Sequence, residues 1–553
     1  MISSFFPELA RFAYGPQAIA IALATPLVFL ISCAWPRLQA LRPMLLALAP
    51  IPALVVCVLA ADSGPLILDQ MLFPAVFVLD PPGALLLCVS ALLWIAAGAY
   101  AIASMREQLQ NGWFAACWLL TLFGNVSVFL AADVISFYLA FALVSLPAYG
   151  LIVGRRGAEE SVGRLYFSVA LLGEAFLIVA FATLELGEPD HSLLISDGVA
   201  ALAASPWRNV TIGLTIAGFA TKIGVLPFHV WMPSTYRAAP IPVAAVLSGA
   251  AVNAGVVGLL RFLPLGASLT AWGDLLVTLG MVGAFYGVAI GLTQRNPKVL
   301  LAYSSISQMG LIAATLGQGL AATNSVAAGA AALYAAHHGL AKGGLFLATG
   351  VVMAGSSGRR VWTLPLIALL ALSLAGLPPT GGMIAKLAIK EPLGDGLLGV
   401  LSSLSAIAST MLMLHFLARL RYAPPCCEGK SAIGVTAPWL LVTIASIVIP
   451  AAYFVADTPA GIAPLLNFRL VRDFLWPPLA GAVLAAASWR WIDRAPIAPE
   501  GDIAVLAQRA AGGFGFAGLF IECAERLLRS WPAAAATILA IGISLAGAGF
   551  SQH

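Results

Sequence analysis

The chain has 553 residues, of which 61% are hydrophobic and only 9% are charged, and its formal net charge is +4. An ordinary soluble domain carries roughly a quarter charged residues, so this composition excludes a soluble enzyme. With 24 acidic and 28 basic residues there is too little charge to solvate so long a chain, and most of its surface must face lipid. The 53 glycines and 35 prolines suit closely packed and sometimes broken helices, so we expect an all-α polytopic membrane protein.

Breaks at charged residues, prolines and glycines divide the chain into about 16 apolar segments, each near the roughly 20 residues that a bilayer-crossing helix needs. The expected helix starts lie near residues 16, 44, 81, 112, 132, 161, 209, 241, 272, 299, 324, 362, 397, 436, 474 and 531. Residues 1–15 contain no small-residue cleavage site after a short apolar core, so we expect no cleavable signal peptide.

Basic residues are concentrated in the odd-numbered connections between these segments. Those connections contain Arg37, Arg42, Arg106, Arg155, Arg156, Arg164, Arg237, Arg295, Lys298, Arg359, Arg360, Arg419, Arg421, Lys430, Arg490, Arg494, Arg509, Arg526 and Arg529. The even-numbered connections near 62–79, 131 and 320 carry none, and Arg469 and Arg472 are the largest exception. Because Lys and Arg favour the cytoplasmic side, this alternation predicts that both termini are extracytoplasmic.

The first candidate for chemistry is a lysine inside the seventh span. An ionisable group within a membrane costs several kcal/mol unless it is paired or hydrated, so each one is a functional candidate. Lys222 follows Arg208 by 14 residues, or about 21 Å of helix, and should lie well inside the span. Pro227 predicts a break just beyond it, where backbone dipoles and water are accessible, and His229 in that break is an accessory candidate. The alternative is a lysine that extends to the membrane interface.

The second candidate is the segment LYAAHHGLAKGGLF. His338 and Lys342 are four residues apart and share one helical face, whereas His337 points elsewhere and is an accessory candidate. An imidazole beside a buried amine suits a two-step proton relay. A hydrogen-bonded structural histidine is the alternative.

The third candidate follows LAGLPPTGG, whose prolines and glycines should interrupt the twelfth span. Lys386 and Lys390 then share a face of the second half-helix, with Lys386 the better buried of the two. The alternative to a functional role for Lys390 is that it only forms an interfacial ion pair with Glu391 near the outer surface.

A lysine beside a broken helix thus occurs in span seven and again five spans later, and an odd offset inverts the topology. This is the pattern of two inverted five-helix repeats, a device of transporters. We therefore expect N-terminal transmembrane helices in 1–110, a first repeat in 111–265, a second in 266–422, additional spans in 423–492 and a C-terminal span in 531–553. Residues 493–530 are too polar to span and suggest either an interfacial amphipathic helix or a solvated connector.

The seven cysteines form no CxxC pair with metal-site or iron–sulfur spacing, and the sequence contains no nucleotide loop or cofactor motif. They are Cys33, Cys57, Cys88, Cys117, Cys426, Cys427 and Cys523. Buried small hydrophobes are the favoured interpretation, with a redox or metal site at the adjacent Cys426 and Cys427 as the alternative. We expect no cofactor and no metal.

Five motifs resemble the antiporter-like, proton-translocating membrane subunits of NADH-quinone oxidoreductase (complex I), a family shared with Mrp antiporters and formate-hydrogenlyase-type membrane hydrogenases. They are KIGVLPFHVWMP at 222–233, AAPIPVAAVLSG at 238–249, KVLLAYSSISQMG at 298–310, HGLAKGGLF at 338–346 and GLPPTGGMIAK at 376–386. The resemblance implies two half-channels joined by a hydrated polar axis near mid-membrane. By resemblance Lys222 matches the central lysine of the first half-channel, His338 and Lys342 the linking residues, and Lys386 the terminal lysine that exchanges protons with the outside.

Two positions depart from the family's pattern. Ala142 stands where relatives usually carry a fifth-span glutamate, and Asn253 stands where an eighth-span lysine or histidine is usual. Glu174, an intramembrane carboxylate at a position where relatives commonly have a small residue, is our candidate for the missing partner, joined to Lys222 by a salt bridge. The alternative is a degenerate first half-channel, with Glu174 facing a partner subunit.

The resulting interpretation is a proton-conducting subunit of a complex I-like or hydrogenase-type assembly in the bacterial inner membrane. It would act with other membrane and peripheral subunits, carry protons or sodium, and bind no nucleic acid. No redox centre is expected, so neighbouring subunits would supply the energy. The alternatives are an Mrp-type cation/proton antiporter subunit, a proton-coupling subunit for inorganic-carbon uptake with a zinc-bearing partner, and a scaffold that no longer conducts.

Overall fold

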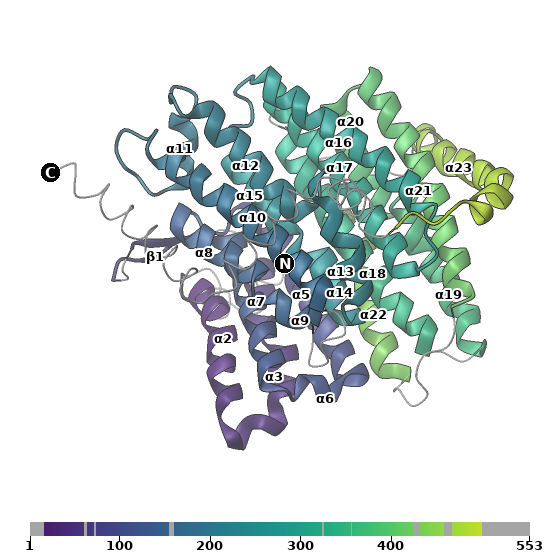
Figure 1. The fold of residues 1–553 in the computed structure, drawn as a ribbon, viewed down its shortest axis with the longest axis horizontal. Coiled ribbons are helices and arrows are strands. Elements are labelled where there is room, and N and C mark those ends of the chain that lie inside the picture. The colour runs from purple at the N-terminus through teal and green to yellow at the C-terminus, as the bar shows by residue number, and fades with distance from the viewer. Residues whose placement is uncertain are drawn as a thin grey trace, which may run out of the picture. The chain divides into compact units, whose positions relative to one another are not determined.

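The computed structural model describes residues 16–59, 64–70, 73–153, 160–322, 326–354, 357–423, 432–457 and 467–499, and these residues are mostly helical (Figure 1). The elements up to the first broken helix are α2 (Pro16–Ala34), η2 (Pro36–Leu41), α3 (Arg42–Leu48), α4 (Ile51–Leu59), β1 (Leu66–Leu68), β2 (Ala75–Phe77), α5 (Pro81–Ser104), α6 (Arg106–Leu109), α7 (Gly112–Leu130), α8 (Val134–Ser145), α9 (Ala148–Val153), α10 (Glu160–Glu185), α11 (Ile195–Ala201) and α12 (Arg208–Ile223). The remainder are η3 (Phe228–Val230), α13 (Trp231–Ala238), α14 (Ile241–Val246), η4 (Leu247–Ala251), α15 (Asn253–Phe262), α16 (Thr270–Gly291), α17 (Pro297–Ala321), α18 (Val326–Ala354), α19 (Ser357–Ser373), α20 (Gly381–Leu393), α21 (Leu397–Arg421), α22 (Ala432–Asp457) and α23 (Phe468–Arg494).

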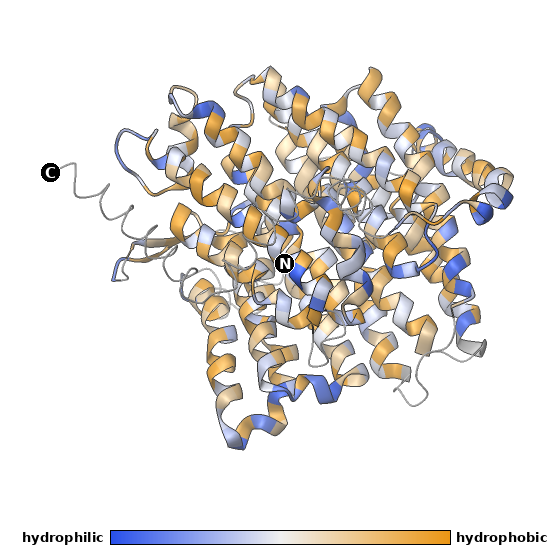
Figure 2. Cartoon of the chain, viewed as in Figure 1, coloured by the Kyte–Doolittle hydropathy of each residue, from blue (hydrophilic) through white to orange (hydrophobic). Residues whose placement is uncertain are grey.

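Thirteen helical segments of the described residues are long and apolar enough to cross a membrane, which confirms the all-α polytopic fold. Helices begin near fifteen of the sixteen expected positions, and the largest difference is at α23, which begins at Phe468. The sixteenth position, the predicted C-terminal span, and most of the predicted interfacial segment lie outside the described residues. Hydrophobic residues cover most of each long helix, while hydrophilic ones gather mainly at helix ends and connections (Figure 2). Sixteen spans and an inverted repeat remain predictions.

Both predicted helix breaks are present. Helix α12 ends at Ile223, and Gly224 follows with a φ of 72°, a left-handed conformation that favours glycine. The second break lies between the last residue of α19, Ser373, and the first residue of α20, Gly381, with Gly376 at a φ of 91°. The prolines and glycines of these segments therefore interrupt their helices as the sequence predicts.

A third irregularity, the π-helical turn η4, was not predicted from the sequence. It lies between α14 and α15 and packs against α18. Two side chains bind its carbonyl groups: Asn125 of α7 donates to Ala250 O at 3.2 Å, and Asn253 donates to Gly249 O at 3.0 Å. These bonds satisfy groups that the irregular backbone would otherwise leave buried without a partner.

Helix α18 approaches this turn so closely that only glycine fits at residue 339. A Cβ on Gly339 would lie 2.5 Å from Gly249 O and 2.9 Å from Asn253 Nδ2. We expect Gly339→Ala to destabilise the folded chain by about 1–3 kcal/mol, because α18 and η4 must separate. Gly329→Ala on the same helix is the control: its Cβ would meet nothing within 4 Å, so alanine should be neutral or slightly stabilising. Thermal melting of the two purified variants measures the difference, and equal melting would contradict the close contact.

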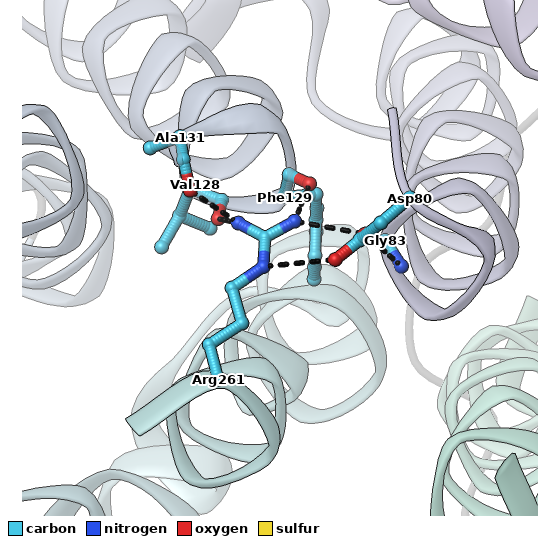
Figure 3. A network of polar contacts seen from close by, with 6 residues as sticks. All are labelled: Asp80, Gly83, Val128, Phe129, Ala131 and Arg261. Carbon is cyan, nitrogen blue, oxygen red and sulfur yellow. Dashed lines mark hydrogen bonds and ion pairs between the residues drawn. The ribbon is translucent and has the colours of Figure 1, made fainter. Parts of the chain in front are cut away.

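Arg261 joins three helix ends (Figure 3). Its guanidinium lies 2.9 Å from Asp80 Oδ1 and donates to three carbonyl groups at the end of α7, those of Val128, Phe129 and Ala131. Asp80 is also the N-cap of α5 and accepts a hydrogen bond from Gly83 N at 2.8 Å. One cation therefore neutralises a capping carboxylate and occupies the negative end of a helix dipole.

Candidate functional site

Lys222 lies in the last turn of α12, directly before the first break. Its side chain is 7% exposed, and its Nζ donates a 3.0 Å hydrogen bond to Ser145 Oγ at the end of α8. The same amine lies 5.7 Å from the centre of the Phe141 ring. A hydroxyl and an aromatic face, both neutral, are thus the direct partners of this lysine.

Glu174, on α10, is buried at 5% exposure and faces the same cluster. Neither carboxylate oxygen makes a hydrogen bond, yet the carboxylate is close enough to interact electrostatically with Lys222 and Ser145. The hypothesised direct salt bridge to Lys222 is absent from the ion pairs of the described residues. Glu174 therefore lies within electrostatic range of Lys222 but does not form the direct ion pair that the sequence suggested.

A small cavity adjoins this lysine. It is bounded by Phe141, Ser145, Tyr166, Ala170, Thr221, Lys222 and Trp231. The volume open to the centre of a water-sized sphere is about 10 Å³, close to what one water molecule needs, and its polar walls supply hydrogen-bonding partners. A proton on Lys222 thus has space for a water-mediated transfer.

Asn253 is the first residue of α15, which follows the π-helical turn η4 in the chain. It is fully buried, and its amide donates back to Gly249 O in η4. Two residues later, Gly255 lies against the Lys222 stem: a Cβ there would be 3.1 Å from Lys222 Cβ. Helix α15 therefore connects the Lys222 cluster to the face of α18 that Gly339 presents.

His338 and Lys342 lie on one face of α18, as the sequence predicts, and both are fully buried. Lys342 Nζ donates to Leu301 O of α17 at 2.9 Å, while neither ring nitrogen of His338 has a hydrogen-bond partner. A buried imidazole with both nitrogens unbonded is costly to hold in a protein interior. The interpretation of His338 as a hydrogen-bonded structural histidine therefore does not describe this geometry.

His337 points away from that face toward the second helix break. Its Nε2 lies 3.2 Å from Ser373 Oγ, at the end of α19. A Cβ on Gly381 or on Gly382 would lie 3.1 Å from its ring. His337 is also within electrostatic range of Lys386, so the two adjacent histidines of α18 face different partners.

Lys386, in the second turn of α20, is 7% exposed and its amine makes no hydrogen bond. Its Nζ lies 5.9 Å from the centre of the Tyr334 ring on α18. Tyr334 donates to Gln308 Oε1 at 2.6 Å, and Gln308 in turn donates to Ser409 Oγ at 3.0 Å. Tyr334, His338 and Lys342 follow one another at four-residue spacing, so they share one face of α18. This row of polar groups begins at Lys342 and ends at Tyr334, whose ring faces Lys386 of α20.

The remaining accessory candidates lie at the edges of this arrangement. Lys390 is largely exposed and pairs with Asp395 at 3.8 Å, so Asp395 is its partner instead of the suggested Glu391. His229 is fully buried in the first break, with its ring 5.1 Å from that of Tyr286.

Sequence reasoning missed the polar residues that contact the candidates. Ser145 lies three residues after Ala142, on the helix face where the family's carboxylate is expected. This spacing was the one sequence signal that could have identified Ser145 as a contact of Lys222. Tyr334, Gln308 and Ser409 come from three separate helices, and no spacing rule links them. Among the described residues, no three His, Cys, Asp or Glu side chains gather to hold a metal ion.

Two relatives illustrate the similarity of this chain to known proteins. They are NADH-quinone oxidoreductase subunit N of Salinispora tropica, 32% identical over 331 residues, and hydrogenase-4 component B of Escherichia coli, 27% identical over 339 residues. The first match covers 54% of this chain and 64% of that protein, and the second 56% and 49%. The chain thus spans less than two thirds of the length of either relative.

Two solved structures share the fold. A chain of the Mrp complex from Dietzia sp. superposes with a TM-score of 0.73 at 22% identity, covering 97% of this chain and 63% of that one. A chain of the membrane-bound sulfane sulfur reductase, an archaeal respiratory membrane complex, has a TM-score of 0.66 at 21% identity, covering 85% and 99%. The family model described as NADH:quinone oxidoreductase/Mrp antiporter, TM matches residues 131–412, more than half of the chain. The motifs and this match agree: the chain belongs to the NADH:quinone oxidoreductase/Mrp antiporter family of multi-pass membrane proteins.

Proposed function

We propose that the chain is a proton-translocating membrane subunit of a complex I-like or hydrogenase-type assembly. One observation carries the proposal: Lys222, Lys342 and Lys386 are buried amines, and no carboxylate of the described residues lies within 4.0 Å of any of them. Unpaired amines in a membrane interior are costly and persist where an ion pathway uses them. Two of the three lie near a helix break, Lys222 in the last turn before the first break and Lys386 in the second turn after the second break. In membrane proteins such breaks leave backbone groups that can bind water or ions.

The proposed route begins at Lys222 with Glu174, continues past Asn253 to His338 and Lys342, and ends at Lys386. Ser145 and one water would serve the first step, since both have a place beside the Lys222 amine. His337 would join the second break to this line through Ser373. Because hydroxyl, amide and imidazole groups both donate and accept hydrogen bonds, they can support a hydrated path without fixing the proton.

The assembly supplies what this chain lacks. The sequence has no nucleotide loop and no cofactor motif, so conformational or electrostatic changes in partner subunits must drive the protons. We place the chain in a bacterial inner membrane with extracytoplasmic termini, in accordance with the distribution of its basic residues.

Proton flux through the purified assembly in lipid vesicles tests the proposal. We expect Lys222→Ala and Lys386→Ala each to reduce flux by an order of magnitude or more, because a proton-binding site is removed from a series pathway. Arg164→Ala, an exposed cation on α10, is the control and should conduct normally. Normal proton flux in both lysine variants would contradict the proposal and favour a scaffold that does not conduct. Proton flux that requires sodium would instead favour a cation/proton antiporter subunit.

A further inference from the structure

A cavity of about 750 Å³ lies where α18 begins and where α20 and α22 end. The three helices pack against one another, and because these ends lie together the cavity is at one surface of the membrane-spanning bundle. Ligand pockets in proteins typically measure about 300–1,000 Å³ and combine apolar walls with a few polar groups that orient the ligand. This cavity has both features.

The deeper part of the cavity is apolar. Its walls there include Leu333 of α18, Leu387 of α20 and Phe454 of α22. Leu333 is only 4% exposed, so the space extends inward to the packed core. Gly329 also lines the cavity, and a Cβ on it would meet nothing within 4 Å, so the wall that α18 provides is open there. A hydrocarbon chain can occupy this part without burying an unpaired polar group.

The outer edge of the cavity carries charges of both signs. Lys390 and Glu391 lie in the last turn of α20, and Asp395 follows in the connection to α21. Lys390 Nζ lies 3.8 Å from Asp395 Oδ1, too far for a hydrogen bond, and the two side chains are 54% and 92% exposed. Glu391 belongs to no ion pair of the described residues. All three groups can therefore form hydrogen bonds with a ligand at the surface.

This combination of groups fits one class of membrane lipid. A lysine amine binds the phosphate of a glycerophospholipid, and a primary ammonium group donates hydrogen bonds to carboxylates. One lysine and two carboxylates leave an excess of negative charge, which disfavours an anionic headgroup that has no ammonium group. A quaternary choline headgroup has no N–H to donate. An ethanolamine headgroup carries both the phosphate and the primary ammonium.

We propose that this cavity binds a phosphatidylethanolamine molecule. Its phosphate lies beside Lys390, its ammonium group beside Glu391 and Asp395, and one acyl chain against Leu333 and Leu387. The bound lipid holds the ends of α18, α20 and α22 together at the membrane surface. Binding does not depend on proton translocation, so the site goes beyond the proposed function and can be tested separately.

Photo-cross-linking in the intact assembly tests for the lipid. The assembly is placed in vesicles of phosphatidylethanolamine and phosphatidylglycerol that contain a trace of either lipid with a diazirine in one acyl chain. Peptides that contain Leu387 or Phe454 should react about fivefold more with the phosphatidylethanolamine probe, because the headgroup determines the preference. Peptides around Ile444, 58% exposed on α22, are the bulk-lipid control and should react equally with both probes. Equal reaction in the cavity, or no reaction because a partner subunit covers it, overturns the proposed site.

Two variants test the acyl-chain and headgroup parts of the site separately. Gly329→Trp should fill the cavity and reduce cross-linking there about tenfold, whereas Gly329→Ala should retain it because the alanine Cβ meets nothing. Glu391→Lys reverses the excess charge at the exposed edge and should change the preference to the phosphatidylglycerol probe. Unchanged cross-linking in Gly329→Trp, or an unchanged headgroup preference in Glu391→Lys, contradicts the proposal. The comparison of the two probes on the wild-type assembly needs neither variant, so the proposal can be overturned even if a variant does not fold.

Discussion

Replacing Glu174 by Gln should reduce proton translocation as severely as replacing Lys222 by Ala. The carboxylate is buried, forms no hydrogen bond to the described residues and lies within electrostatic range of Lys222, so its ionised form would attract the charged lysine amine. Glutamine keeps the shape and removes the charge. We expect a loss of an order of magnitude or more in the initial rate of dye-detected acidification in vesicles that contain the intact assembly.

The control for this variant is Glu160→Gln on the same helix. Glu160 is exposed and pairs with Arg164 one turn away at 3.7 Å, an arrangement worth little in water. The Glu160→Gln variant should therefore translocate protons at the normal rate. If Glu174→Gln also does so while Lys222→Ala is inactive, Glu174 has no part in the first half-channel and the alternative of a residue facing a partner subunit gains support.

Ser145 makes a further distinction possible. Its hydroxyl is the direct acceptor for Lys222 Nζ, and it also interacts with Glu174. If the three residues act as one unit, Ser145→Ala and Glu174→Gln should combine non-additively, so that the double variant is little slower than the slower single variant. Independent contributions would multiply instead, and initial proton flux in the four proteins separates the two cases.

The broken helices could be predicted because their cause is local. Pro227 and the Pro378–Pro379 pair cannot continue a helix, and Gly224 and Gly376 supply the left-handed conformations that the breaks require. Burial of Lys222 and Lys386 could be predicted for a similar reason, since helical rise and span length place a residue at a known depth. Each inference needed only residues within one span.

The contacts of these residues could not be predicted in the same way. Lys222 meets Ser145 across 77 positions of sequence, and Lys342 meets Leu301 O across 41. Which helix faces which depends on packing of small residues, such as Gly339 against Gly249, which sequence periodicity does not report. The sequence predicted a salt bridge between Glu174 and Lys222 for the same reason. The position of a residue within its span gives its depth in the membrane, but not its distance from a residue on another helix.

The π-helical turn η4 illustrates this limit most clearly. Nothing in LSGAA distinguishes it from an ordinary helical turn. Its carbonyl groups are bound by Asn125 and Asn253, and the first of these lies 125 positions earlier in the chain than its acceptor. Asn253, considered from sequence only as a lost proton carrier, thus also supports the backbone at the point where α15 meets α18.

Arg261→Met should destabilise the fold more than any other single change discussed above, by about 3 kcal/mol. Arg261 has a side chain only 11% exposed and serves both Asp80 and the last carbonyl groups of α7. Methionine keeps much of the length and the apolar stem but leaves a carboxylate and three carbonyls without their donor. We expect a lower apparent melting temperature for the purified chain and less of it in membranes.

Asp80→Asn is the matched comparison and should cost less, about 1 kcal/mol, because asparagine is still a good N-cap for α5 and Arg261 keeps its three carbonyl partners. The proton flux per folded molecule should be unchanged in both variants, since Arg261 contacts none of the buried lysines or histidines in its hydrogen bonds. Unchanged melting with lost flux would reverse this assignment and place Arg261 in the proton pathway. The two readouts together thus separate a residue that holds helix ends in position from one that carries charge.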